Sequence, residues 1–232
     1  SRQFSNVFRS VTGIDIDRTA IEFAKRSFQK RNLRFIHDDA TKLPLPKNHC
    51  DVVICQEVYS YVQDPVALMR EIFRVLRPGG ICYFAGDNLL FPIESQYRFP
   101  FLHYLPDPIA TKLLKLLGND RVWLGHYKTY RGLKRLCRGF TIADYTLIVL
   151  NAPNRFGFVR LVKYQPIIRL LPQLLQLLLL PLLPTFIWIL EKPLGEKRLA
   201  ARTGADEADA TNTNLPGSQS GRTWRAPPQG SG

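Results

Sequence analysis

The chain has 232 residues, of which 45% are hydrophobic, and this suits one domain with a sizeable core plus appendages. Its four cysteines show neither a CxxC motif nor a Cys/His metal spacing, which excludes that class of metal site. With no signal peptide at Ser1, they predict reduced thiols in a cytoplasmic protein. The net charge of +13 indicates an anionic partner, either a membrane surface or nucleic acid, without choosing between them.

The first elements of the chain alternate between strand and helix. Residues 1–10 have the pattern of a helix end. Residues 11–16 form a short apolar run that ends in an acid, which predicts a buried parallel strand. Residues 17–31 follow as a predicted helix with Asp17 as its N-cap. The apolar stripe of this helix consists of Ala20, Ile21, Ala24 and Phe28.

Three further strands and one helix are predicted before residue 86. The strands are residues 33–37, 51–55 and 81–85. The helix covers residues 64–76, and we expect the Pro-Gly-Gly at positions 78–80 to stop it and turn the chain. Strands that alternate with helices predict a parallel α/β sheet with right-handed crossovers.

The second half of the chain is less regular. Residues 87–108 are rich in aromatic residues and proline, which predicts a loop with short helical pieces. A basic helix is predicted at residues 130–138, and strands at residues 140–150 and 186–191. Residues 195–232 lack the apolar content needed to fold, so we expect a disordered tail there.

Three short segments in fixed order carry a family resemblance. They are residues 11–17 (VTGIDID), residues 34–46 (RFIHDDATKLPLP) and residues 51–80, which end in the string RVLRPGG. Together they resemble the middle of a class I S-adenosylmethionine (SAM) dependent methyltransferase of type 11. That family carries a Gly-rich loop after its first strand, whereas only ten residues precede Val11 here. We therefore expect an N-terminally truncated methyltransferase.

The resemblance implies an α/β, Rossmann-like fold with a seven-stranded sheet in the order 3-2-1-4-5-7-6, strand 1 being absent from this chain. Residues 1–194 would form this domain, incomplete at the N-terminus, and residues 184–193 its last antiparallel strand, beside residues 140–150. A Leu-rich insertion would occupy about residues 164–184. Because strand 1 is central, its absence exposes the edges of its neighbours. We expect such a chain to be unstable and to bind SAM weakly or not at all.

A SAM site at the carboxyl ends of the strands is also implied by the resemblance. Asp15, followed by Ile16, would accept hydrogen bonds from the ribose hydroxyls, since ligands of open α/β sheets bind at this edge. Cys55 and Gln56 would lie beneath the methionine part of the cofactor. The alternative is that Asp15 merely ends a strand, with Asp17 capping the next helix.

The adenine end of the site is implied by a second pair of residues. Asp39 would accept a hydrogen bond from the adenine amino group, and the Ala40 backbone would contact the ring. Asp38 stands where the family usually has glycine, so its Cβ lies close to the expected cofactor position. The alternative is that both acids are solvated turn residues.

Residues 88–106 follow the predicted strand 81–85 and, by resemblance, cover the site and contact the acceptor. The substrate lid is expected to use Asn88, Arg98 and Tyr104, and the candidates for a proton-accepting or catalytic role are His103, Glu94 and Tyr97. For each of them the alternative is a surface or packing residue. Ser60 and Tyr61 stand where many relatives have a His pair, which argues against a base from that loop.

The function that the resemblance implies is SAM-dependent methyl transfer to oxygen or carbon of a small or lipid-like acceptor. SAM is an activated donor, so most of the rate comes from holding nucleophile, methyl group and sulfur in line. Two alternatives stay open: a catalytically silent interaction protein with this fold, and an RNA methyltransferase suggested by the net charge. The chain has no Asn/Asp-Pro-Pro-Tyr/Phe motif for a flipped base.

Residues 170–190 contain no charged residue over 21 positions, which is long enough for a transmembrane segment. Pro172, Pro181 and Pro184 oppose a continuous helix there. Because Lys163 and Arg169 flank this apolar insertion, we expect a peripheral protein that docks on an anionic membrane face. The alternatives are packing into the core, a dimer face and a true span.

Overall fold

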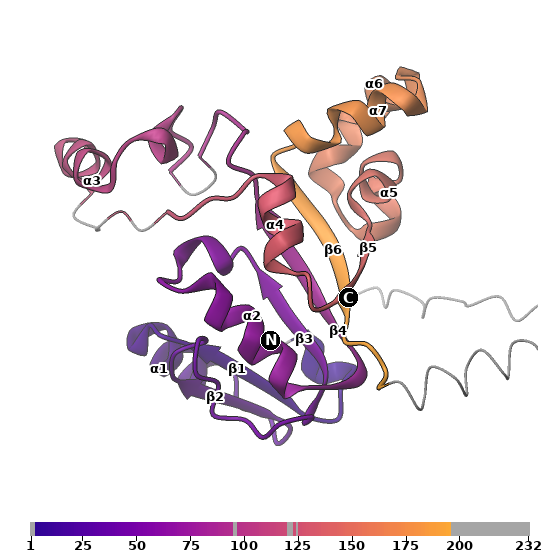
Figure 1. Ribbon diagram of the computed structural model, residues 1–232. Coiled ribbons are helices and arrows are strands. Elements are labelled where there is room, and N and C mark those ends of the chain that lie inside the picture. The colour runs from indigo at the N-terminus through magenta and orange to yellow at the C-terminus, as the bar shows by residue number, and fades with distance from the viewer. Residues whose placement is uncertain (1–2, 95–96, 120–122, 124, 196–232) are drawn as a thin grey trace, which may run out of the picture. The chain divides into compact units, whose positions relative to one another are not determined.

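The computed structural model describes residues 3–94, 97–119, 123 and 125–195, and their strands form two sheets (Figure 1). The tail expected at residues 195–232 lies outside the described residues from position 196 onward. The strands β1 to β4 alternate with the helices α1 and α2, so the parallel α/β pattern predicted from the sequence is confirmed for this part of the chain.

The first sheet pairs β1 (Val11–Asp15) with β2 (Leu33–His37) in parallel. Helix α1 (Arg18–Ser27) connects them and starts at Asp17, whose Oδ1 accepts hydrogen bonds from the amides of Thr19 and Ala20 at 2.8 and 3.1 Å. This confirms the predicted N-cap, because such a bond satisfies an amide that lacks a helical partner.

Two boundaries near this sheet differ from the prediction. Helix α1 ends at Ser27, not at residue 31, and the first ten residues hold one 3-10 turn, η1 (Phe4–Asn6). The side-chain amide of Asn32 donates to the carbonyls of Ser5 and Phe8 at 2.7 and 3.0 Å. These bonds tie the segment after α1 to the N-terminal segment, so it cannot continue the helix.

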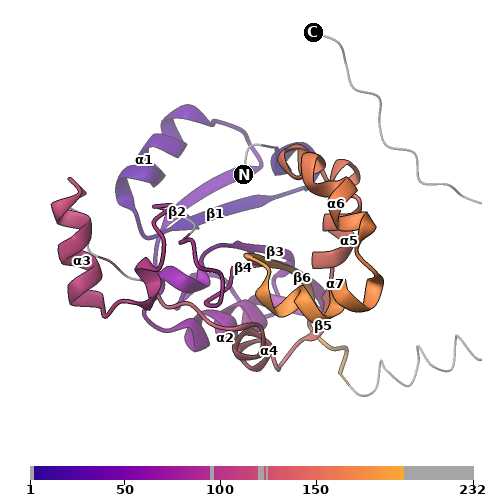
Figure 2. The ribbon, with the colours of Figure 1, turned by 90° about the horizontal axis from the view of Figure 1, so that it is seen from above.

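The second sheet has the order β3-β4-β6-β5. Its strands are β3 (Cys50–Gln56), β4 (Leu76–Asp87), β6 (Thr185–Glu191) and β5 (Thr141–Asp144). The pair β3–β4 is parallel, whereas β6 runs antiparallel to both β4 and β5. This is the order expected for the last four strands of the family sheet. Among the described residues β1 and β3 are both edge strands, and Figure 2 shows the β1–β2 pair as a separate sheet.

Helix α2 (Pro65–Val75) packs on this sheet and is capped by Asp64, which accepts from the amides of Val66 and Ala67 at 2.9 Å. The predicted helix 64–76 does end before Pro78-Gly79-Gly80, but these three residues belong to the following strand and do not form a turn ahead of it. The helix ends at Val75, and the glycines lie within β4, where the register with β3 shifts. A Cβ on Gly80 would lie 2.9 Å from the Arg77 carbonyl oxygen of the same strand and 3.1 Å from the Asp51 carbonyl oxygen of β3, so both the local bend and the neighbouring strand favour glycine there.

The predicted strand at residues 140–150 is wrong in its second half. Strand β5 ends at Asp144, and α5 (Thr146–Asn151) follows. The Oδ1 atom of Asp144 accepts from the Thr146 amide at 2.9 Å. The amide of Tyr145 makes the next bond to β6, at Ile187, and the chain then turns into the helix. A side-chain acceptor at this position therefore outweighs the strand propensity of the run that follows.

The 3-10 helix η2 (Tyr59–Tyr61) lies between β3 and α2 in the sequence. The remaining described helices follow β4 and precede β6 in the sequence. They are η3 (Leu102–Tyr104), α3 (Asp107–Leu116), α4 (Tyr130–Leu136), η4 (Pro153–Phe156), η5 (Val159–Tyr164), α6 (Gln165–Leu170), α7 (Gln173–Leu179) and η6 (Leu180–Leu182), together with α5, given above. No helix within the described ranges has the length and apolar character that a membrane crossing requires.

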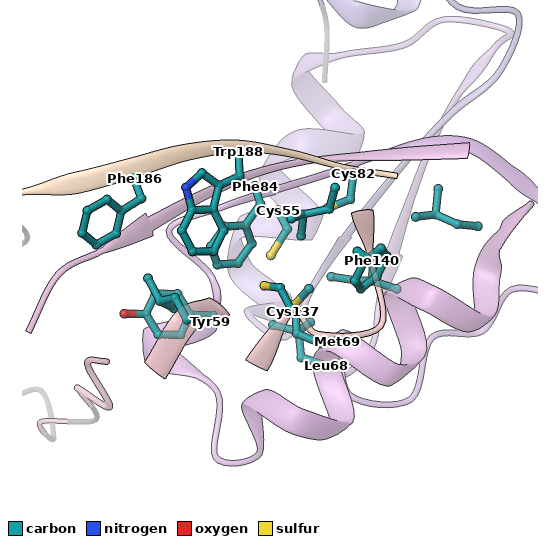
Figure 3. Packing of buried hydrophobic residues seen from close by; sticks show 14 residues of the cluster. Cys55, Tyr59, Leu68, Met69, Cys82, Phe84, Cys137, Phe140, Phe186 and Trp188 are labelled. Carbon is teal, nitrogen blue, oxygen red and sulfur yellow. The ribbon is translucent and has the colours of Figure 1, made fainter. Parts of the chain in front are cut away.

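The main core lies on one face of the second sheet, under α2 and α4 (Figure 3). Phe84 of β4 and Trp188 of β6 are both fully buried, with ring centroids 5.8 Å apart. A smaller cluster forms around Leu102, Leu114 and Trp123, in the segment after β4. This second cluster gives the described residues between Tyr97 and Tyr127 a core of their own beyond the end of β4.

Candidate functional site

The carboxyl ends of β1 and β2 lie against each other. The Asp38 amide donates to the Asp15 carbonyl at 3.1 Å, and a ring nitrogen of His37 lies 2.9 Å from the Ile16 carbonyl. Asp15 is exposed, and its Oδ1 accepts from the Asp17 amide at 2.9 Å. The structure thus brings the acid at the end of β1 next to the acidic turn after β2.

The turn after β2 is ordered by its own acids. Asp38 Oδ1 accepts from the Asp39 amide, and Asp39 Oδ1 accepts from the Thr41 amide, both at 2.8 Å. The hydrogen bonds from Thr41 lower the pKa of Asp39 below its usual value, since they favour the charged carboxylate. Ala40 is half-buried and packs against the main core. Asp39 therefore stands as an ionised acceptor at this edge.

Cys55 and Gln56, at the end of β3, point to different surroundings. The Cys55 side chain packs in the core with Phe84 and Met69, and burial raises the pKa of its thiol to about 12 (Figure 3). Its sulfur is thus part of the core and not of the strand edge, whereas Gln56 is exposed at that edge. The sequence alone already indicates that the Cys55 and Gln56 side chains face opposite sides of the sheet, because successive side chains of a strand alternate.

Glu57, which follows β3, has a backbone that sequence reasoning did not anticipate. Its φ is +56°, in the left-handed region that a non-glycine residue seldom adopts. Burial and the nearby charge of Asp87 raise the pKa of Glu57. The left-handed turn carries the chain from β3 into η2 and leaves the Glu57 amide bonded to the Ala85 carbonyl at 2.8 Å.

Helix α2 holds the loop that follows the acidic turn. Glu71 accepts from the Leu43 amide at 2.8 Å, and the guanidinium of Arg74 donates to the carbonyls of Leu43 and Leu45 at 2.9 and 2.8 Å. Arg74 also binds Glu71, with Nε and Oε1 2.7 Å apart. The first arginine of the RVLRPGG string therefore fixes the segment that carries Asp39.

Acidification should loosen this loop. The hydrogen bond from Arg74 lowers the pKa of Glu71 below its usual 4.5, so the stabilisation is present above that value and is lost as pH falls through the lowered pKa of the folded state. We expect Glu71→Gln to lower the melting temperature at neutral pH and to lose less stability on acidification than the wild type. Thermal unfolding followed by circular dichroism across this pH range measures both effects.

The matched control is Glu22→Gln, which removes an exposed i, i+4 partner of Arg18. Exposed pairs of this kind contribute little, so its melting curve should follow that of the wild type. Equal acid sensitivity of wild type and Glu71→Gln would contradict the assignment.

A cavity of about 450 Å³ lies beyond the carboxyl end of β4. It is lined by Asp87, Asn88, Phe91, Ile93, Glu94, Arg98, His103, Tyr127, Pro184 and Thr185. Gln56 pairs with Ala85 in the parallel register, so the cavity begins two residues past the strand edge that holds Gln56. Concave sites with apolar walls and a few polar groups are the usual form of small-molecule sites.

Glu94 is the most buried polar group of this cavity, 1% exposed. One of its oxygens accepts from the Tyr127 hydroxyl at 2.6 Å and from the Tyr61 hydroxyl at 3.4 Å, and the two hydroxyls lie 3.2 Å apart. The other oxygen accepts from the Tyr97 amide at 2.5 Å. These bonds hold the carboxylate in place, as a buried polar group requires.

His103 stacks beside Tyr127, with ring centroids 4.9 Å apart, and is 8% exposed. Its Nε2 lies 3.0 Å from the Leu89 carbonyl, which can only accept, so Nε2 carries the proton. In the neutral ring Nδ1 then holds a lone pair. Among the described residues this buried nitrogen has no hydrogen-bond partner.

The cavity thus gathers Asn88, Glu94, Arg98 and His103 from the expected lid, but two other candidates do not line it. Tyr97 packs its ring on Trp123 in the smaller core, at 6.0 Å between centroids, and Tyr104 is 47% exposed. Sequence reasoning missed Tyr127 and Asp87 as lining residues. Asp87 was detectable as an acid at the end of a strand, whereas no local pattern marks Tyr127.

Comparison with known proteins identifies the domain. Residues 1–84 match the family described as "Methyltransferase domain". The chain is 28% identical over 153 residues to a demethylmenaquinone methyltransferase of Geobacillus stearothermophilus, covering 63% of this chain and 64% of that protein. It is 30% identical over 139 residues to a Staphylococcus aureus protein of the same name, covering 58% and 57%. The chain thus spans about three fifths of the length of these relatives.

A solved structure shows the same fold. The crystal structure of an S-adenosylmethionine-dependent methyltransferase from Mesorhizobium loti matches with a TM-score of 0.54 at 17% identity, covering 81% of this chain and 82% of that one. Residues 1–84 thus match the methyltransferase domain family, and the chain shares the fold of a solved S-adenosylmethionine-dependent methyltransferase.

Proposed function

We propose that the protein transfers the methyl group of SAM to oxygen or carbon of a small, lipid-like acceptor that binds in the cavity beyond β4. The observation that carries this proposal is the position of the cavity, which adjoins the strand edge where this fold places its cofactor. SAM supplies an activated methyl group, so the chain's own residues need only bind, orient and move a proton.

The residues at the strand edge fit the cofactor. Asp15 is exposed and offers carboxylate oxygens to the ribose hydroxyls, and Asp39, ionised by its bonds with Thr41, offers an acceptor for the adenine amino group. Gln56 lies at the carboxyl end of β3 in the second sheet, beside Ala85 of β4 and therefore near the cavity. The Cys55 side chain, buried in the core, takes no part in this set.

Within the cavity, His103 is the best-placed group to accept a proton. The lone pair of its Nδ1 is buried and lacks a partner among the described residues, so it can accept the proton of an acceptor hydroxyl once the ring turns to expose Nδ1 to the cavity. Glu94, held by Tyr61 and Tyr127, fixes the ring that stacks on His103. Glu94 is therefore a positioning residue in this proposal.

The acceptor class is supported by the cavity and by the relatives' names. Phe91, Ile93 and Pro184 form an apolar wall that suits a ring or an isoprenoid chain. The relatives are named demethylmenaquinone methyltransferases, and we carry a quinone-like acceptor over to this chain. Such an acceptor partitions into membranes, so we place the protein in the cytoplasm at a membrane surface.

The proposal is tested with the full chain, SAM carrying a labelled methyl group, and a short-chain demethylated menaquinone. We expect label in the extracted quinone and SAM binding by calorimetry, a result that would contradict the expectation from the sequence that this chain binds SAM weakly or not at all. We expect Asp15→Asn to weaken SAM binding by about 10- to 100-fold, because a hydrogen bond to a charged group is lost. Asp107→Asn, an exposed acid of α3, is the control and should bind as the wild type does.

The possible negative results of this experiment point to different conclusions. SAM binding without label transfer to any lipid extract would favour a catalytically silent interaction protein. Salt-dependent retention of RNA, with label in the RNA, would favour a nucleic-acid methyltransferase. Unchanged affinity in Asp15→Asn would remove that residue from the cofactor site.

A further inference from the structure

Helices α6 and α7 with η6 present a surface of exposed apolar side chains. We call the leucine surface the set Ile167, Leu170, Leu174, Leu177, Leu178 and Leu182, each more than half exposed. Leu170 is 84% exposed, Leu174 70% and Leu178 67%. The described residues therefore do not bury these side chains in the core. Contiguous apolar patches on a soluble protein mark contact sites.

The polarity of α7 is the reverse of that of an ordinary surface helix. Its one half-buried polar residue, Gln176, donates to the carbonyls of Ile168 and Leu171, both at 3.0 Å, and accepts from the Asn151 side chain at 2.8 Å. The glutamine thus faces the protein, where it satisfies carbonyls at the end of α6, and the leucines face outward. A surface helix in contact with water shows the opposite pattern.

The charge around this surface has one sign. Between Asp144 and Glu191 the sequence contains no acidic residue. Arg155, Lys163 and Arg169 are exposed in the same interval, and α5, α6 and α7 lie together on one side of the second sheet in both ribbon views (Figures 1 and 2). Basic residues beside an apolar surface match the charge of an anionic bilayer, whereas two copies of this surface would repel each other.

The leucine surface is joined to the wall of the cavity. The side-chain amide of Asn88 donates to the carbonyls of Pro181 and Leu183, both at 2.8 Å, and its backbone amide donates to the Pro184 carbonyl at 2.9 Å. Asn88 and Pro184 line the cavity. The chain therefore runs from η6 directly into the cavity wall at Pro184.

We propose that the leucine surface docks the protein on an anionic lipid bilayer and that Asn88 holds it so that a lipid-like acceptor passes from the membrane into the cavity. The route of the acceptor rests on the proposed function, whereas the docking itself does not. The helices are too short to span a bilayer, so they lie in its interface, with the leucines among the acyl chains and the basic residues at the headgroups.

Co-sedimentation with vesicles tests the docking in the absence of SAM and acceptor. The full chain is mixed with phosphatidylcholine vesicles that contain or lack phosphatidylglycerol. We expect binding that is strongest with the anionic lipid and weakens with salt. Leu170→Gln/Leu174→Gln/Leu178→Gln should lower the partition coefficient about 1,000-fold, because each leucine buried in lipid contributes about tenfold.

The charged residues are tested separately. Arg155→Gln/Lys163→Gln/Arg169→Gln should lower binding to anionic vesicles by about 100-fold, or about fivefold for each basic residue, and should leave binding to neutral vesicles unchanged. The control is Leu116→Gln/Leu117→Gln, which changes the last residue of α3 and its C-cap, 84% and 57% exposed, outside the leucine surface. Circular dichroism confirms that each variant is folded.

Three outcomes would overturn the proposal: no binding to anionic vesicles at low salt, equal loss of binding in the control variant, or a dimer in solution that the triple leucine variant dissociates. Vesicle binding with no methyl transfer would leave the docking intact and contradict only the proposed function. Methyl transfer to a soluble quinone without vesicle binding would support the proposed function and contradict the docking.

Discussion

His103→Ala is expected to lower kcat for methyl transfer by about 100- to 10,000-fold, the range attributed to a positioned general base, while SAM binding is unchanged. The reason is the geometry of the ring. Nε2 is committed to the Leu89 carbonyl, which leaves Nδ1 as the basic nitrogen within the cavity wall. The measurement is single-turnover transfer of the labelled methyl group, with SAM affinity measured by calorimetry.

Added imidazole separates a chemical role from a structural one. The alanine variant leaves space for free imidazole, which should restore part of kcat if the lost group was a base. His49→Gln changes an exposed histidine after the loop held by Glu71 and Arg74 and is the control. An activity loss that imidazole does not restore, together with a lowered melting temperature, would make His103 a packing residue.

Trp188→Ala is expected to destabilise the domain by about 3–5 kcal/mol, because truncation of a buried aromatic residue leaves a cavity. Trp188 is fully buried and lies between Phe84 and Phe186, with ring centroids at 5.8 and 6.0 Å (Figure 3). Tyr130 of α4 packs edge-on at 5.6 Å, so the change also loosens the helix from the sheet. Urea unfolding followed by circular dichroism measures the free energy of unfolding.

Trp188→Phe gives the matched comparison. The indole Nε1 is buried with no hydrogen-bond partner among the described residues, so its removal relieves an unsatisfied donor. We expect this variant to lose about half as much stability as the alanine variant, or less. Phe23→Ala, at a ring 65% exposed, should change stability by no more than about 0.5 kcal/mol. Equal losses in the phenylalanine and alanine variants would contradict this explanation.

The helix starts and the apolar strands could be predicted because their causes are local. Asp17 and Asp64 each accept hydrogen bonds from amides two and three residues ahead, so the cap is visible in the sequence itself. The helix ends were less predictable. Asn32 binds a segment 24 to 27 residues away, and this distant contact holds the chain that follows α1.

The residues of the strand edge were also within reach of the sequence. Parallel strands place their carboxyl ends on one edge, so acids that follow β1 and β2 come together whatever the loops do. The cavity could not be predicted from the sequence. The Tyr127 hydroxyl bonds to Glu94, 33 positions away, and the tautomer of His103 is set by its contact with the Leu89 carbonyl. These contacts depend on how the segment after β4 packs around Trp123.

The sequence by itself determined the family resemblance, most of the strands, the helix caps and the acids at the carboxyl ends of β1 and β2, because periodicity, capping and parallel topology act over short distances along the chain. Only the tertiary structure decided which lid residues line the cavity, that the Cys55 side chain belongs to the core, and that Gln176 faces inward while its leucines face outward. These features depend on side-chain packing between distant segments, which local patterns do not encode.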